Sequence, residues 1–196
     1  MTNIAKVFTF AFLSLSSGLV SAADISTYSF SGCAFPDTNK STSYTATLGE
    51  DHDYASSVST MSFTIYNGVD WGGTATSSVT VDNRTGLMWM TNPNDAGRGG
   101  LYTWEGALTA CEGLTYAGFS DWRLPNVREL LSILDYGQTS GVFINTKYLF
   151  NPQACWSSTT PAPANTSALI VSPYGQAVSN LKTNTYYVRC VRGGPP

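Results

Sequence analysis

Thirteen residues near the middle of the chain, 118–130, constrain the fold more than any other part of the sequence. They read Gly-Phe-Ser-Asp-Trp-Arg-Leu-Pro-Asn-Val-Arg-Glu-Leu and combine an aromatic loop, a proline and a helix start. Asn126 and Glu129 have the spacing of a capping box, so a helix is predicted directly after Pro125. The apolar residues that would face the core repeat at helical spacing: Val127, Leu130, Leu131 and Leu134. We expect Asp135-Tyr-Gly137 to end this helix.

The loop before this helix has two interpretations. Trp and Arg are frequent binding hot spots, so Trp122 and Arg123 could form an exposed ligand site. We favour a structural role, in which Trp122 fills the core. Asp121 and Arg123 would then bond backbone groups, because an irregular loop must satisfy its buried backbone polar atoms.

Helical and strand patterns surround this stretch. An earlier helix is predicted after an N-cap at Thr103, because Trp104, Ala107, Leu108, Cys111 and Leu114 form one apolar stripe. Alternating or apolar runs predict strands at 28–30, 44–48, 61–66, 79–81, 87–90, 155–159, 168–171 and 185–191, the last being the strongest. Residues 92–100, rich in Gly and Asn, are expected to form a flexible loop.

The N-terminus has the pattern of an export signal. Lys6 precedes a mostly apolar run, 7–20, that is short for a membrane span. Small residues at 20 and 22 favour cleavage after Ala22, so residues 1–22 are predicted to be a signal peptide for the Sec pathway. A retained membrane anchor is the less favoured alternative. No later segment is apolar enough to span a bilayer, so no membrane span is expected after cleavage.

The composition of the chain limits the classes of partner that it can bind. Charged residues make up 12 % of the 196 residues, against about 25 % in an average soluble domain. The formal net charge is −3. Binding to nucleic acid or to anionic lipid relies on clustered Lys and Arg, so the composition argues against nucleic-acid partners.

Four cysteines follow the predicted signal peptide: Cys33, Cys111, Cys155 and Cys190. An even number in an exported protein favours disulfides, and four cysteines allow three pairings. A metal site is disfavoured, because no two cysteines have Cys-x-x-Cys spacing and the single histidine, His52, is remote in sequence.

Five motifs, taken together, resemble a known family. In chain order they are Asp82–Trp89, Trp104-x-x-Ala107, Ala117–Leu130, Cys155-Trp-Ser-Ser-Thr159 and Val188–Gly193. They are similar to the bacterial domain found at the C-terminus of the Legionella collagen-like adhesin. The resemblance covers residues 79–194, and a shorter stretch at 48–54 is similar to a segment that often precedes that domain.

The resemblance implies an α+β, C-type lectin-like fold, related to that of the formylglycine-generating enzyme. We therefore expect a small twisted antiparallel sheet with two flanking helices and long loops over 79–194. A β-rich N-terminal extension, 23–78, would precede it. In C-type lectin-like domains a cysteine on the first helix bonds one on the last strand, which implies a Cys111–Cys190 disulfide. Cys33 and Cys155 are left as the second pair.

The family relations also raise a metal and an enzyme hypothesis. Asp51 and Asp53, beside Glu50, are weak calcium candidates, but the sugar-binding calcium motifs of C-type lectins do not occur in this sequence. The formylglycine-generating enzyme uses two cysteines near its C-terminus, and only Cys155 and Cys190 could fill that role. A Cys111–Cys190 disulfide would remove this pair. We therefore expect no cofactor and no catalysis.

The leading functional hypothesis is recognition or adhesion at the cell envelope, with a polysaccharide or protein as ligand. The segment 157–186 is rich in hydroxyl, amide and phenol side chains, a mixture typical of binding loops. The candidate ligand-binding residues are Tyr174, Asn180, Lys182, Asn184 and Tyr186. The adhesin relative binds sulfated polysaccharides, which here would need a cluster such as Arg98, Arg123, Arg128, Lys147 and Lys182.

A structural envelope or filament subunit is the second hypothesis, and a homo-oligomer fits either one. A redox enzyme of the formylglycine-generating type is the least favoured. The predicted location is secreted or at the cell surface, with the periplasm as the alternative.

Overall fold

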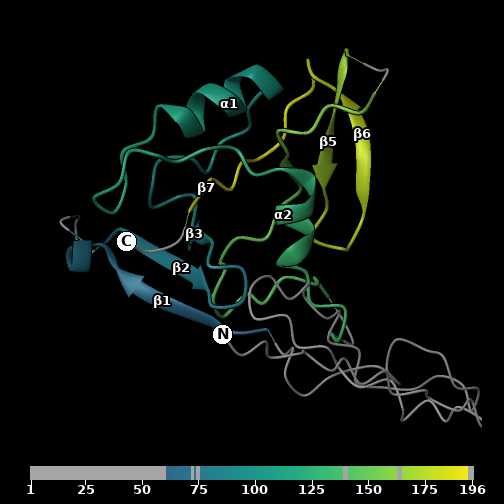
Figure 1. Cartoon of the computed structure of the whole chain (residues 1–196). Coiled ribbons are helices and arrows are strands. Elements are labelled where there is room, and N and C mark those ends of the chain that lie inside the picture. The colour runs from purple at the N-terminus through teal and green to yellow at the C-terminus, as the bar shows by residue number, and fades with distance from the viewer. Residues whose placement is uncertain (1–60, 72, 74–75, 139–140, 163–164, 194–196) are drawn as a thin grey trace, which may run out of the picture. The chain divides into compact units, whose positions relative to one another are not determined.

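The computed structural model describes residues 61–71, 73, 76–138, 141–162 and 165–193. They form an α+β arrangement of two helices and two small antiparallel sheets, in agreement with the expected C-type lectin-like fold (Figure 1). In chain order the elements are β1 Phe63–Asn67, a 3-10 turn Gly68–Trp71, β2 Ser78–Asp82, β3 Met88–Met90, α1 Trp104–Glu112, α2 Val127–Ser132, β4 Cys155–Trp156, β5 Ser167–Val171, β6 Ala177–Leu181 and β7 Val191–Arg192.

The first sheet has the strand order β1-β2-β3-β7. Its inner strands are mostly buried, with Val79, Met88 and Trp89 fully so. A tight turn joins β2 to β3, where Thr85 donates a hydrogen bond to the Asp82 carboxylate. Strand β1 lies before the predicted domain boundary at residue 79, yet it pairs along its whole length with β2 as the edge strand of this sheet.

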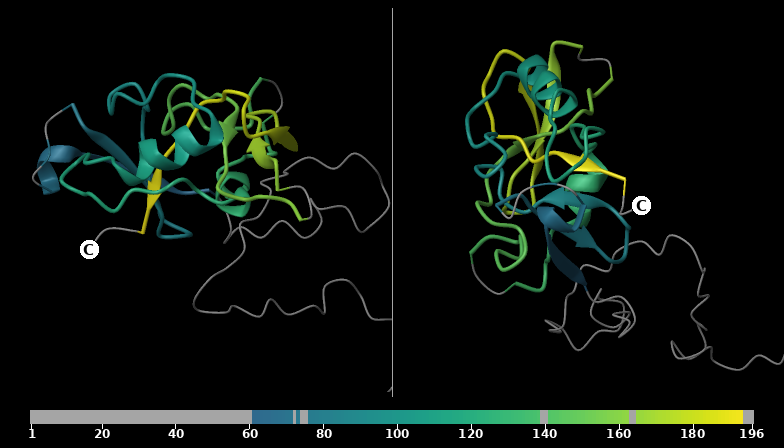
Figure 2. Two further views of the ribbon diagram at one scale, coloured as in Figure 1. Left: turned by 90° about the horizontal axis from the view of Figure 1, so that it is seen from above. Right: turned by 90° about the vertical axis from the view of Figure 1, so that its left-hand side faces the viewer.

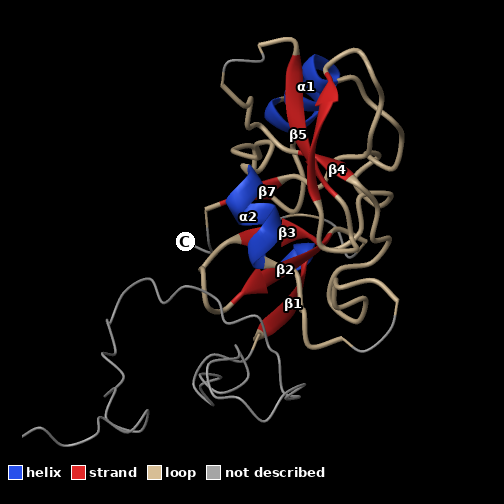
Figure 3. Ribbon diagram, turned by 90° about the vertical axis from the view of Figure 1, so that its right-hand side faces the viewer, coloured by secondary structure: helices blue, strands red, loops and turns tan. Residues whose placement is uncertain are grey.

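The second sheet has the strand order β4-β5-β6. In Figure 1 it lies at the right, and the first sheet lies toward the lower left with α2 between them. Strand β5 buries Ala168 and Ile170 against the core. The sequence did not predict strand β6. Four of its five residues are exposed and the fifth is half-buried, so it has no buried face and its sequence shows no alternation of apolar and polar residues. Figure 3 shows β5 beside β4, and β6, which pairs with the other side of β5, is an edge strand of this sheet.

Both helices begin where the caps predict. Thr103 accepts from the Gly106 amide at the start of α1. At α2, Asn126 and Glu129 form both hydrogen bonds of the capping box. The second helix ends at Ser132, earlier than expected, because the chain turns there to form an antiparallel bridge between Leu134 and Ile144.

The loop 118–125 has the structural role that was favoured. Trp122 is 1 % exposed, and its indole donates to the Tyr116 carbonyl at 3.1 Å. The main partners of Asp121 and Arg123 are side chains rather than the expected backbone groups. Asp121 instead accepts from Arg192 at 2.7 and 3.1 Å, and Arg123 donates both outer nitrogens to Glu129 at 2.8 and 2.6 Å. We name residues 118–130, with Arg192, the bracket.

The segment 185–191 was predicted to be the strongest strand and is not a continuous one. It crosses between the two sheets, visible as the yellow chain in Figure 2. It forms isolated bridges from Tyr186 and Tyr187 and joins the first sheet only at β7. Residues 188–191 are all buried, because the segment contacts both cores. Arg189, 1 % exposed, reaches four backbone carbonyls: those of Met90, Thr91, Phe150 and Asn151.

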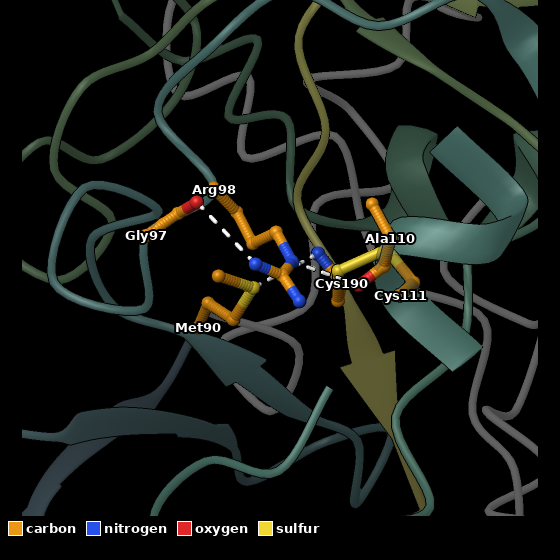
Figure 4. The surroundings of a disulfide bond; sticks show 6 residues. All are labelled: Met90, Gly97, Arg98, Ala110, Cys111 and Cys190. Carbon is orange, nitrogen blue, oxygen red and sulfur yellow. Dashed lines mark hydrogen bonds between the residues drawn. A yellow bond between two sulfur atoms is a disulfide. The ribbon is translucent and has the colours of Figure 1, made fainter. Parts of the chain in front are cut away.

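A disulfide joins Cys111 on α1 to Cys190 just before β7, as the resemblance implies. Figure 4 shows Arg98 beside it, donating to the Ala110 carbonyl at 2.8 Å and to the Gly97 carbonyl at 3.4 Å. These bonds, with further backbone turns, hold the 92–98 loop against α1. The loop that was expected to be flexible is therefore anchored in the structure.

Several predictions fall outside the described residues. They are the signal peptide 1–22, the earlier part of the extension, Cys33, and the calcium candidates Asp51 and Asp53. The Cys33–Cys155 disulfide therefore stays a prediction. Within the part of the chain that the structure describes, Cys155 is a buried free thiol, and no helix is long and apolar enough to cross a membrane.

Candidate functional site

Three of the five candidate ligand-binding residues come together at one end of the β5–β6 hairpin. Asn180 lies near the end of β6, and Lys182 and Asn184 lie in the turn that follows it. The Asn184 amide donates to the Asn180 side-chain oxygen at 2.9 Å, and the Asn184 backbone amide donates to the Leu181 carbonyl at 2.9 Å. The exposed amide side chain of Asn184 in the turn is therefore linked to the half-buried one of Asn180 on β6.

Trp104, at the start of α1, completes this group. The Lys182 ammonium lies 3.9 Å from the centre of the indole ring, within the range of a cation–π contact. The backbone amide of Trp104 donates to the Lys182 carbonyl at 3.0 Å, and its indole donates to the Ser157 carbonyl at 2.9 Å. We name Trp104, Asn180, Lys182 and Asn184 the hairpin end.

The sequence did not reveal the contact between Trp104 and Lys182. The helical stripe placed Trp104 among core residues, and the structure leaves it half-buried, packed against the edge of the core. A helix start and a hairpin turn separated by almost eighty residues meet only through the tertiary fold. The signal present in the sequence was the position of Trp104 directly after the N-cap, where one side of a helix is open to other segments.

Tyr186 has a supporting position behind the hairpin end. Its backbone exchanges two hydrogen bonds with Tyr102, at 2.9 and 3.0 Å. Its half-buried ring meets Trp156 edge-on, with centroids 5.0 Å apart. The Trp156 indole in turn donates to the Tyr102 carbonyl at 2.8 Å. Tyr186 therefore fixes the turn in place and offers a ligand less of its surface than its neighbours do.

Tyr174 lies at the opposite end of the same hairpin. It sits in the turn between β5 and β6, and the five residues of β6, which span about 13 Å, separate that turn from Lys182. The adjacent Gly175 has φ of +90° and packs against Tyr136 and Phe143 so closely that a Cβ would lie 2.9–3.0 Å from their rings. Tyr174 itself is 59 % exposed. The structure therefore separates this residue from the other candidates.

Of the basic residues named for polyanion binding, Arg128 is exposed on α2, and the other four bind different parts of the structure. Arg98 bonds α1, Arg123 is paired with Glu129, and Lys147 lies 5.2 Å from the ring of Tyr148. Burial opposes the positive charge of Arg123, but hydrogen bonding to Glu129 outweighs it and raises the pKa of Arg123. Only Lys182 belongs to the hairpin end, so this surface carries one positive charge rather than a cluster.

The cysteines offer little redox chemistry in this arrangement. Cys190 is bonded to Cys111, so it does not form the free pair with Cys155 that a formylglycine-generating site would need. Burial raises the pKa of the Cys155 thiol to about 11, and the positive charge of Arg189 opposes this shift only in part. The described residues contain no group of three His, Cys, Asp or Glu side chains placed to hold a metal ion.

The family model of the Lcl C-terminal domain matches residues 78–192, which is more than half of the chain. The chain belongs to the Lcl C-terminal domain family. No curated protein matches it. The Lcl C-terminal domain begins at β2 and ends at β7, so the bracket, the disulfide and the hairpin end all lie within the matched region.

Membership of the Lcl C-terminal domain family indicates a surface-associated, adhesin-like domain. The Cys111–Cys190 disulfide agrees with that location, because such bonds form and persist in oxidising compartments. A surface-associated domain binds its partners through exposed side chains, so the exposed groups of this domain are the candidates for a binding site.

Proposed function

We propose that this protein is an exported recognition domain that binds a polysaccharide at the cell envelope through the hairpin end. The observation that carries the proposal is the amide pair of half-buried Asn180 and exposed Asn184 beside the Lys182–Trp104 contact. Sugar hydroxyls both donate and accept hydrogen bonds, and a side-chain amide can do the same. A partly open indole adds an apolar surface of the kind that sugar rings contact.

The support beneath these groups favours binding. The turn is fixed by backbone hydrogen bonds from Trp104 to Lys182 and from Lys182 to Thr166, both 3.0 Å long. Groups that are already held in place lose less conformational freedom when a ligand binds. The polar side chains can then adapt while the backbone stays fixed, as in antibody loops.

The charge of the hairpin end favours a neutral or weakly charged glycan. One lysine, already engaged with an indole, offers limited attraction to a densely sulfated chain. Polyanion binding depends on several basic groups acting together and weakens strongly with salt. We therefore expect binding without a cofactor, without catalysis, and with little dependence on ionic strength.

A glycan array tests the proposal directly. The matured protein is applied with calcium and with a chelator, at low and at high salt, beside the double variant Asn180→Ala/Asn184→Ala. Tyr174→Ala is the matched control, because it removes an exposed side chain from the other end of the same hairpin. We expect calcium-independent binding that the double variant loses by about tenfold or more and that the control retains.

Two results would count against this account. An array without any bound glycan would exclude polysaccharide binding under these conditions. Binding that the Tyr174 variant loses and the double asparagine variant keeps would move the site to the other end of the hairpin.

A structural envelope subunit is the second candidate, and β6 is the observation that favours it. Val178 and Leu181 are 44 % and 53 % exposed, and no charged residue lies in this strand, Ala177–Leu181. Exposed, uncharged edge strands can pair with another chain. Light scattering over a concentration series would show reversible assembly that Val178→Lys abolishes, whereas a monomer at all concentrations would exclude this candidate.

A further inference from the structure

A cavity of about 260 Å³ lies away from the hairpin end, where three segments meet. Gly73 and Ser77 come from the chain before β2. Asp95 comes from the 92–98 loop, and the third wall is the stretch 115–118 after α1. The volume is just below that of drug-sized ligand pockets, so one small group would fill it.

The third wall has an unusual backbone. Tyr116 and Phe119 exchange two hydrogen bonds, at 2.9 and 3.0 Å, around a two-residue turn. Both turn residues have positive φ, +53° at Ala117 and +84° at Gly118. Such a turn favours Asn or Gly, so an alanine here costs stability. Gly73 packs on it so tightly that a Cβ would lie 2.7 Å from the Ala117 Cα, which fixes the cavity floor.

Asp95 is held in place by its own loop. The Asn92 side-chain amide donates to one Asp95 carboxylate oxygen at 3.0 Å, and the Asp95 backbone amide donates to the Asn92 carbonyl at 3.1 Å. The second carboxylate oxygen accepts no hydrogen bond from a described residue. Arg98, which ties the loop to α1, does not line the cavity. Asp95 is therefore the single charged group among the described residues that line the cavity.

The remaining chemistry of the cavity is rich in acceptors. Tyr116 donates its hydroxyl hydrogen to the Ser78 carbonyl at 3.1 Å, so the phenol oxygen has lone pairs left for a ligand. Burial, and then the negative charge of Asp95, raise the pKa of Tyr116 to about 12, and the phenol stays neutral at ordinary pH. A ligand group that fits must donate hydrogen bonds, and a positive charge would be favoured by the carboxylate.

We propose that this cavity binds the protonated primary amine of a small ligand, such as an amino sugar or a lysine side chain. Asp95 would accept its charge-assisted hydrogen bond, and Tyr116 with Thr115 would contact the adjoining atoms. Anions are disfavoured, because the charge contributed by the described lining residues is that of a carboxylate. The site is independent of the hairpin end and does not rest on the glycan proposal.

The test is a ligand titration in which the amide chemical shifts of the isotope-labelled protein are measured at each ligand concentration. The probes are glucosamine, glucose, N-acetylglucosamine and lysine amide with its α-amine acetylated. We expect glucosamine or the lysine derivative to shift the amides of residues 95 and 115–118, and the stronger of the two identifies the source of the amine. Glucose and N-acetylglucosamine, which lack the charge, should bind about tenfold more weakly or not at all.

Asp95→Asn should reduce the affinity for the amine probes by about tenfold or more, since the asparagine keeps an acceptor for Asn92 but loses the charge. Glu105→Gln is the matched control. It removes one negative charge from an exposed position on α1 and should leave binding unchanged. Equal binding of glucose and glucosamine would overturn the proposal. So would amine binding that Asp95→Asn does not weaken in a protein with an otherwise unchanged spectrum, or the lack of any shift at 50-fold excess of every probe.

Discussion

The bracket and the hairpin end both contain Trp, Asn and basic side chains, but these side chains differ in their burial and in their binding partners. In the bracket, Trp122 is buried and Arg123 is bound by both nitrogens to a carboxylate. At the hairpin end, Trp104 is half-buried and Lys182 lies on its ring without a carboxylate partner among the described residues. In the bracket these residue types are buried or paired with a carboxylate and so stabilise the fold. At the hairpin end they keep part of their surface open to solvent.

The comparison predicts unequal effects on stability, the largest at the bracket. Trp122→Ala removes a fully buried indole and leaves a cavity, which should lower the free energy of unfolding by about 3–5 kcal/mol. Tyr174→Ala, at an exposed position, should change it by less than about 0.5 kcal/mol. Denaturant unfolding measures both. Similar losses for the two variants would show that the hairpin belongs to the cooperative core.

The Cys111–Cys190 disulfide should contribute slightly less than Trp122 to the free energy of unfolding. It closes a loop between residues 79 apart in sequence, so its loss should lower the free energy of unfolding by about 2–5 kcal/mol. Thermal unfolding with and without a reductant measures this difference. The double variant Cys111→Ala/Cys190→Ala is the control: it lacks this disulfide, so the reductant should lower its unfolding temperature by less than that of the wild type. A wild-type protein whose unfolding does not change after full reduction would contradict the prediction.

The ion pair of the bracket should show a smaller, pH-dependent effect. Burial alone would raise the pKa of Glu129, but hydrogen bonds from Arg123 and from the Asn126 amide outweigh it and lower this pKa. Stability from a carboxylate with a lowered pKa is complete above its unfolded value, about 4.3, and is lost as pH falls through the folded value. Glu129→Gln should cost about 1 kcal/mol at pH 7.

Unfolding at pH 7 and at pH 3 separates this contribution from other acid effects. The gap between the wild type and Glu129→Gln should narrow as the pH falls. A gap that stays constant over this range would mean that the glutamate acts through packing rather than through its charge.

The smallest effect on stability is expected at the hairpin end. Asn180→Ala/Asn184→Ala removes one exposed hydrogen bond between side chains, so the free energy of unfolding should change by less than about 0.5 kcal/mol. Denaturant unfolding checks this. A loss above 2 kcal/mol would mean that the amide pair serves the fold, and it would erase the distinction from the bracket.

The local features of this fold were readable from the sequence. Thr103, and Asn126 with Glu129, mark both helix starts, because a cap and the helix it begins lie within a few residues of each other. Trp122 was correctly placed in the core. The disulfide followed from the family resemblance rather than from spacing, since four cysteines alone leave three pairings.

The features that depend on tertiary contact were not readable. Strand β6 has no buried face, so nothing in its pattern marks it as a strand. Residues 185–191 touch both cores, and their run of apolar and aromatic side chains therefore resembles one long strand. The partners of Asp121 and Arg123 are side chains brought close by the fold. For the same reason the sequence suggested three residues of the hairpin end but not their contact with Trp104, and it gave no sign of the cavity at Asp95.

The central claim, that the bracket holds the fold and the hairpin end binds the ligand, is tested most directly by one chemical-shift titration. A polysaccharide selected on the glycan array is added to the labelled protein, and the shifts of both regions are followed together. We predict shifts at Trp104, Asn180, Lys182 and Asn184, with residues 118–130 unchanged. Shifts centred on 118–130 with an unchanged hairpin end would contradict the account.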